Sequence, residues 1–220
     1  MADDSDLVAL FPLPNVVLFP DVDLLLHVFE PRYRAMVGDA MNGDRRIGMV
    51  LLRADWRRDD QGSPPIFPLG CLGGIEKFEL LADGRSNLLL RGLRRFEVVE
   101  EIGGKPYRQA RVRWRDEATP AAGSAAAVGV AARLRSVVGM LFEGASEAPP
   151  AGWWEGMPEA LAGLVNRLGF ALDLEPVEKL SLLDCDDALS RAQRLVEILE
   201  FLAAERRLGA GSARGEGAWH

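Results

Sequence analysis

The chain has 220 residues, of which 48% are hydrophobic and 27% are charged, and its formal net charge is −7. This composition is typical of a soluble globular chain, and the negative charge argues against a protein whose main partner is nucleic-acid backbone. No apolar stretch approaches the roughly 20 residues of a membrane span. The start of the chain lacks the basic segment of a secretory signal, so we expect a cytoplasmic protein that does not associate with membranes.

The region from residue 7 to about residue 117 has strand-like patterns. Short runs rich in Val, Ile, Leu and Phe alternate with turn clusters such as residues 58–65 and 82–87. Asp83-Gly84 lies between two apolar runs and predicts a tight hairpin, because this pair tolerates the positive φ angles of such turns. These patterns predict a β-rich domain over residues 7–117.

The apolar period becomes helical after about residue 121. Apolar side chains recur at helical spacing in residues 130–142, 161–168 and 189–202, and Pro176 suits the first turn of another helix. These patterns predict a helical bundle over residues 121–208. Residues 209–220 lack apolar periodicity, and we expect them to form a disordered tail.

The stretch HVFEPRYRAMV, residues 27–37, contains side chains that could form a catalytic cluster. Pro31, however, suits a first helical position, and the apolar residues from Tyr33 onwards follow one helical stripe. Glu30 would then lie at the helix N-terminus, where a carboxylate is favourable, and could pair with Arg32. We interpret Glu30, Pro31, Arg32 and Tyr33 as a structural motif.

The sequence contains no recognisable catalytic or metal-binding motif. Apart from His27, the only histidine is His220, and Cys71 and Cys185 lie far apart without a CxxC spacing. A nucleophile elbow, a zinc-protease motif and a phosphate loop are also absent from it. We therefore expect no enzymatic activity, no cofactor and no metal ion.

Five successive segments resemble the N-terminal substrate-binding domain of Lon-type ATP-dependent proteases. They are LFPLPNVVLFP (10–20), LLLHVFEPRYRAMVGDAM (24–41), RRIGMVLL (45–52), GCLGGIEKFELLADGR (70–85) and LLLRGLRRFEVVE (88–100). The F-E-P-R-Y and R-G-x-x-R-F strings are together fairly specific. The chain departs from the family pattern at Asp21, where glycine is common, and at Leu25, where proline often stands.

The resemblance implies an α+β fold, in which a β pseudobarrel similar to the PUA RNA-binding module is followed by a C-terminal helical bundle. It also implies a freestanding Lon N-terminal-domain protein, because the ATPase phosphate loop and the protease Ser-Lys pair are absent from the sequence. We expect a non-enzymatic module that binds unfolded or partly exposed polypeptide, with a protease or chaperone system as a candidate partner.

Exposed apolar side chains beside a sheet, or a free strand edge, could bind such a polypeptide. The candidate contact residues are Leu13, Val17, Phe19, Leu25 and Phe29, and the alternative for each is a place in the barrel core.

RNA binding is the alternative function, suggested by the likeness to the PUA module and by the arginines within residues 91–95 and 111–115. Glu97, Glu100 and Glu101 lie close enough in sequence to neutralise these arginines by cross-strand pairing. Together with the net charge of −7, this pairing argues against nucleic acid as a partner.

Overall fold

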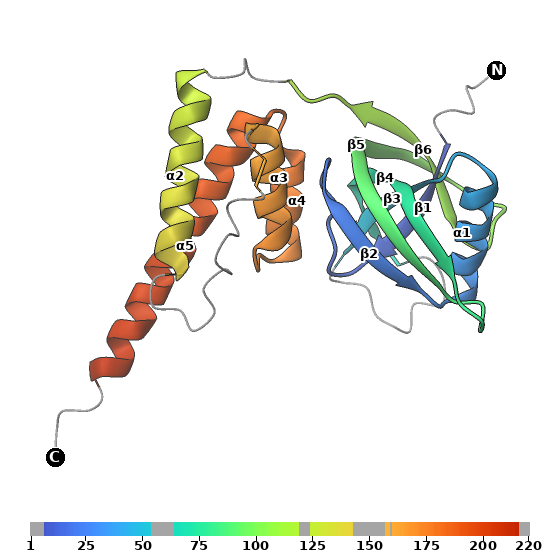
Figure 1. Cartoon of the computed structure of the whole chain (residues 1–220), viewed down its shortest axis with the longest axis horizontal. Coiled ribbons are helices and arrows are strands. Elements are labelled where there is room, and N and C mark those ends of the chain that lie inside the picture. Colours follow the sequence, from blue (N-terminus) through green and yellow to red (C-terminus); the bar gives the residue numbers. More distant parts are fainter. Residues whose placement is uncertain (1–6, 54–63, 119–123, 143–156, 159, 216–220) are drawn as a thin grey trace. The chain divides into compact units, whose positions relative to one another are not determined.

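The strands precede most of the helices along the chain, as the change of apolar period predicts. The computed structural model describes residues 7–53, 64–118, 124–142, 157–158 and 160–215. The strands are β1 (Leu7–Leu13), β2 (Asp23–Val28), β3 (Arg46–Leu52), β4 (Ile66–Leu80), β5 (Ser86–Ile102) and β6 (Arg108–Arg115). The helices are α1 (Pro31–Asn42), α2 (Ala125–Phe142), α3 (Leu161–Ala171), α4 (Pro176–Asp184) and α5 (Ala188–Gly215) (Figure 1). The expected α+β class is confirmed.

The six strands form one sheet in the order β2-β5-β4-β3-β1-β6, and a further pairing between β5 and β6 closes it. Strand β5 makes this closure possible because its first part pairs with β2 and its second part pairs with β6. Register shifts in the β3–β4, β4–β5 and β5–β6 ladders allow the strands to bend. The closed sheet has the connectivity of the expected pseudobarrel, and β2 lies outside the closed ring.

Asp83-Gly84 forms the turn between β4 and β5. The Leu81 N–H donates to the Arg85 carbonyl at 2.8 Å, and Gly84 has a φ of 80°, which glycine adopts at little cost. The Asp83 carboxylate accepts the Arg85 N–H at 3.0 Å. This hydrogen bond lowers the pKa of Asp83 and fixes the hairpin end.

The barrel core is built around Phe96, which is fully buried. A Cβ at Gly70 would lie 2.5 Å from the Phe96 ring, so only glycine admits the ring there without a shift. Trp114 closes one side with an edge-on contact at a centroid distance of 6.4 Å. The buried residues of this cluster are Val8, Leu10, Val50, Leu72, Phe96, Ala110 and Val112.

The chain divides into two compact units. The first contains residues 1–116 and 166–184, and the second contains residues 117–165 and 185–220. The first unit therefore includes α4 and half of α3, whereas the helical pattern groups residues 121–208 together. Periodicity reports which segments are helical, but it does not report which element each helix packs against.

Residues 166–184 are attached to the barrel within the first unit. The Asn166 side chain donates to the Pro20 carbonyl at 3.1 Å. Gly169 lies against the ring of Phe19, which would be 3.4 Å from a Cβ at that position. These contacts hold the second half of α3 against the segment that leads into β2.

In the second unit, an ion pair joins the start of α5 to the segment after β6. Arg191 is fully buried, and its guanidinium binds both oxygens of Glu117 at 2.9 and 3.0 Å. Helix α5 continues to Gly215. The segment expected to be a disordered tail from residue 209 is therefore helical as far as 215, and residues 216–220 lie outside the described part.

Candidate functional site

Strand β2 exposes apolar side chains on its outer face. Leu25 is 80% exposed, and Phe29, directly after the strand, is 61% exposed. Leu25 lies opposite Leu89 of β5, and the rings of His27 and Phe29 stack with centroids 6.3 Å apart. We call Leu25, His27, Phe29 and Leu89 the β2 patch. Exposed apolar side chains that lie near one another can serve as an interaction site.

A chain of polar contacts orients His27 within the β2 patch. Asn87 Nδ2 donates to Glu79 at 2.8 Å, which leaves Asn87 Oδ1 as an acceptor 2.8 Å from His27 Nδ1. His27 Nδ1 therefore carries a proton, and Nε2 accepts from Arg85 at 3.4 Å. Arg85 is bound in turn to Asp83 at 2.6 Å.

The expected contact residues separate into exposed and buried sets. Leu25 and Phe29 lie on the surface, but Val17 and Phe19 are only 4% and 0% exposed and belong to the core. Leu13 is half-buried and lines a cleft of about 670 Å³. Val17 and Phe19 are thus not available to a partner in this structure, because the barrel has already buried their side chains.

The cleft beside Leu13 combines apolar and charged walls. Its apolar lining includes Pro12, Leu13, Pro14, Leu52, Ile102 and Pro106. Two ion pairs also line it, Glu30 with Arg32 at 2.9 Å and Arg108 with Glu101 at 2.7 Å. Lys105 adds a further positive group to the lining, so the cleft presents both signs of charge beside its apolar wall.

The F-E-P-R-Y string starts helix α1 and attaches it to β1. Glu30 is the N-cap residue and Pro31 is the first helical residue. Arg32 binds Glu30 and lies 4.5 Å from the Tyr33 ring centroid. Tyr33 is 5% exposed and its ring lies 4.3 Å from that of Phe11, and burial raises the pKa of Tyr33.

The first half of the R-G-x-x-R-F string ties β5 to the segment around β2. Arg91 pairs with Asp23 at 3.0 Å. Gly92 admits the Phe19 carbonyl, whose oxygen would lie 1.9 Å from a Cβ at that position. Any larger residue at position 92 would therefore push the backbone of this segment away.

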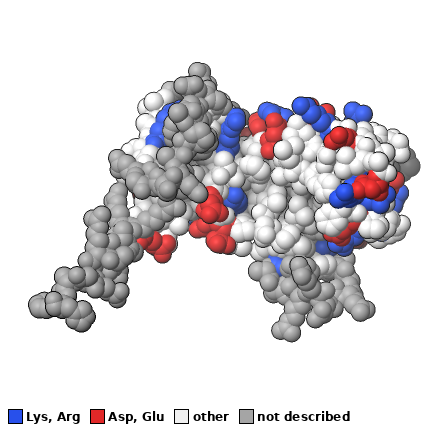
Figure 2. Space-filling view, turned by 60° about the horizontal axis from the view of Figure 1, so that its bottom comes forward, with Lys and Arg blue, Asp and Glu red and all other residues white. Residues whose placement is uncertain are grey.

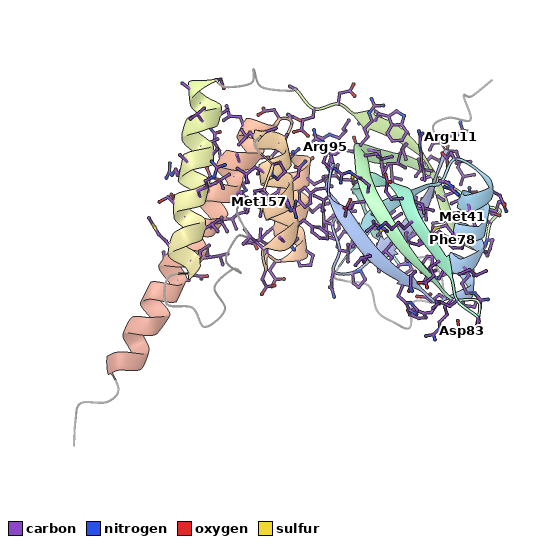
Figure 3. All side chains as sticks on the ribbon, viewed as in Figure 1. Met41, Phe78, Asp83, Arg95, Arg111 and Met157 are labelled. Atoms are coloured by element: carbon purple, nitrogen blue, oxygen red, sulfur yellow. The ribbon has the colours of Figure 1, made fainter. Side chains whose placement is uncertain are left out.

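Arg95, in the second half of the string, binds helix α4. Its side chain is buried at 1% exposure and donates to the Leu183 carbonyl at 2.7 Å (Figure 3). Carbonyl groups in the last turn of a helix lack intrahelical partners, and a cation is favourable there. The alternation of apolar and polar residues along β5 does not reveal this role. Because Arg95 is buried, it is not available to RNA with the other arginines of residues 91–95.

The arginines of β6 are paired with acidic residues. The pairs are Arg111–Glu100 at 3.6 Å, Arg113–Glu97 at 2.5 Å and Arg115–Asp184. Basic and acidic side chains alternate on the face drawn in Figure 2, and Figure 3 labels Arg111 on β6. This pairing removes much of the positive potential that a nucleic-acid phosphate would require.

Among the described residues, no cluster of three or more His, Cys, Asp or Glu side chains could hold a metal ion. In the same part of the chain, no helix is long and apolar enough to cross a membrane.

The closed sheet with appended helices places the chain among α+β barrel domains. A family model described as the ATP-dependent protease La (LON) substrate-binding domain matches residues 8–200, and the chain belongs to this family. A Lon protease of Cytophaga hutchinsonii is 26% identical over 192 residues, which cover 87% of this chain and 24% of the relative. Lon protease 2 of Myxococcus xanthus is 33% identical over 110 residues, which cover 50% of this chain and 13% of the relative. The chain thus spans about a quarter or less of these relatives.

Two solved structures are similar over most of their length. The Lon N-terminal domain protein from Xanthomonas campestris has a TM-score of 0.57 and 27% identity, covering 87% of this chain and 97% of that chain. The N-terminal domain of Mycobacterium avium complex Lon protease has a TM-score of 0.61, and the match covers 88% of this chain and 98% of that chain. Its identity of 16% makes it evidence for the fold alone. The family match is to the substrate-binding domain, and it does not extend to an ATPase or protease domain.

Proposed function

We propose that the chain is a non-enzymatic module that binds unfolded or partly exposed polypeptide through the β2 patch. The observation that carries this proposal is the joint exposure of Leu25 in β2 and of Phe29 directly after it, at 80% and 61%. Water leaves such side chains when an apolar group of a client covers them, which favours association. Membership of a family named for substrate binding supports the same function.

The size of the patch supports weak binding. Covering a large apolar side chain completely contributes about 1.5–3 kcal/mol, and a flexible client loses conformational freedom when it is ordered. Weak binding suits a module that hands its client on. We propose a cellular protease or chaperone system as the partner that acts on the bound polypeptide.

The experiment measures the affinity of the full chain for a fluorescently labelled, permanently unfolded protein by anisotropy. The double variant Leu25→Ser with Phe29→Ser should bind at least tenfold more weakly. Val99→Ser is the matched control, because Val99 is 65% exposed on β5 and lies outside the β2 patch. Unchanged affinity of the double variant, with an unchanged melting temperature, would contradict the proposal.

A further inference from the structure

The topology of the sheet leaves one strand edge open. Among the described strands, β1, β3, β4 and β6 each have two strand neighbours and β5 has three, whereas β2 pairs with β5 alone (Figure 1). The free side of an edge strand presents a row of unpaired N–H and C=O groups. These groups can pair with another extended chain.

Hydrogen-bond alternation identifies the backbone groups on the free side of β2. The Gly92 N–H donates to the Val22 carbonyl at 2.9 Å, so the backbone of Val22 faces β5. In an antiparallel ladder, residues that face the partner strand alternate with residues that face away. Asp23, Leu25 and His27 therefore direct their N–H and C=O groups to the open edge, where no backbone hydrogen bond to a described residue is found.

Strand β2 contains no proline, lysine or bulge, and its one carboxylate is that of Asp23 at its first residue. Proteins often place proline, lysine or a bulge on such strands. The sequence of β2 is DLLLHV, and its ladder with β5 runs through six residue pairs without a register shift. Leu25 and His27 combine exposed side chains with edge-facing backbone groups, so both kinds of contact are available at one place.

We propose that β2 is a docking edge, onto which an extended apolar segment of a non-native polypeptide adds as a further strand. Leu25 and His27 would exchange main-chain hydrogen bonds with the client, and the β2 patch would contact every second client side chain. This inference rests on the proposed function and adds its mode of recognition. It requires clients with apolar residues at alternate positions and a free N–H on each residue that faces β2.

Edge length and charge favour a client segment over a second copy of the chain. Two paired strands of six residues bury far less than the roughly 1,200 Å² of a specific, stable interface. Each copy also carries a net charge of −7, which makes two copies repel each other. A client segment flanked by basic residues is instead attracted.

The first test compares three labelled peptides of about eight residues, with leucine and serine at alternate positions. One is unmodified, one is N-methylated on the leucines, and one is N-methylated on the serines. Methylation removes a donor from a single edge of the peptide, so one methylated peptide should bind the full chain at least tenfold more weakly than the other. Equal binding of all three would overturn edge pairing and leave the proposed function standing. Failure of the unmodified peptide to bind would overturn both.

The second test uses two variants at one position. Leu25→Pro removes the outward N–H without removing a hydrogen bond to β5, whereas Leu25→Ala removes the side chain and keeps that N–H. We expect Leu25→Pro to bind the unmodified peptide at least fivefold more weakly than Leu25→Ala, and equal affinities would overturn the inference.

Amide hydrogen exchange tests the wild-type chain directly. The amides of Leu25 and His27 should exchange at least tenfold more slowly when the chain is saturated with the unmodified peptide. Binding without this protection would overturn the inference, and protection that follows chain concentration without peptide would identify a second copy as the occupant.

Discussion

Arg95 and Leu183 lie 88 positions apart in the sequence, yet the guanidinium of Arg95 donates to the Leu183 carbonyl oxygen at 2.7 Å. This contact joins the middle of β5 to the end of α4 inside the first unit. A buried cation at a helix C-terminus satisfies a carbonyl group and interacts favourably with the helix dipole. The contact between Arg95 and Leu183 thus connects the R-G-x-x-R-F string to helix α4.

Replacing Arg95 with alanine should therefore destabilise the first unit. A hydrogen bond to a charged group contributes about 1.5–3 kcal/mol, and the variant also leaves the Leu183 carbonyl without this donor. Urea denaturation should detect a loss of about 3 kcal/mol. Arg94→Ala is the control, because Arg94 is exposed and pairs with Asp116 at the surface, where such a pair contributes at most about 1 kcal/mol. Equal effects of the two variants would refute the role assigned to Arg95.

The folded chain should be less stable with aspartate at position 21 than with glycine there. Asp21 has a φ of 61°, in the left-handed region, where non-glycine residues are strained by about 1–2 kcal/mol. Its pairing with Arg91 at 3.8 Å is exposed and contributes little. We expect thermal stability to decrease in the order Asp21→Gly, wild type, Asp21→Ala, with aspartate intermediate because it tolerates this region better than alanine. A melting temperature of Asp21→Gly below that of Asp21→Ala would contradict this account.

The N-cap of α5 should make stability depend on pH at acid values. Asp187 accepts the Ser190 N–H at 2.8 Å and its hydroxyl at 2.9 Å, and the backbone bond is the main cause of the lowered pKa of Asp187. A depressed carboxyl pKa adds stability above the unfolded value, roughly pH 4, and this contribution is lost as pH falls through the folded pKa.

Asp187→Asn retains an N-cap acceptor but cannot titrate, so the difference in urea midpoint between wild type and this variant should shrink below about pH 4. Asp187→Ala removes the cap and should cost about 1 kcal/mol at neutral pH. A constant difference between wild type and Asp187→Asn at all pH values would show that the carboxylate charge does not contribute.

We predict no appreciable binding of single-stranded RNA at physiological salt, because the β6 arginines are paired with acidic residues and the net charge is −7. Apolar contact with an unfolded peptide should persist or strengthen as salt rises, whereas phosphate binding should fall steeply. Titrations of both ligands at low and high salt separate the two functions. Tight, salt-sensitive RNA binding that is lost in Arg111→Ala or Arg113→Ala would reverse the assignment.

Local patterns in the sequence determined the kinds and order of the elements. The change from period 2 to period 3.6 predicts strands before residue 117 and helices after it, and the strands end at Arg115 while α2 begins at Ala125. Asp83-Gly84 and Pro31 marked a turn and a helix start, because these conformations depend on neighbouring residues alone. The motif strings also predicted the family, since they record residues in a fixed order.

Only the tertiary structure decided which apolar residues are exposed and which arginines are buried. Phe19 and Phe29 both follow apolar runs, but one is fully buried and the other is 61% exposed. Exposure depends on pairings between distant segments: β5 closes the barrel with β6 and leaves β2 at the edge with Leu25 outward. Arg95 is buried for the same kind of reason, because α4 returns to cover it from 88 positions away. Short-range periodicity carries no information about contacts made over such separations.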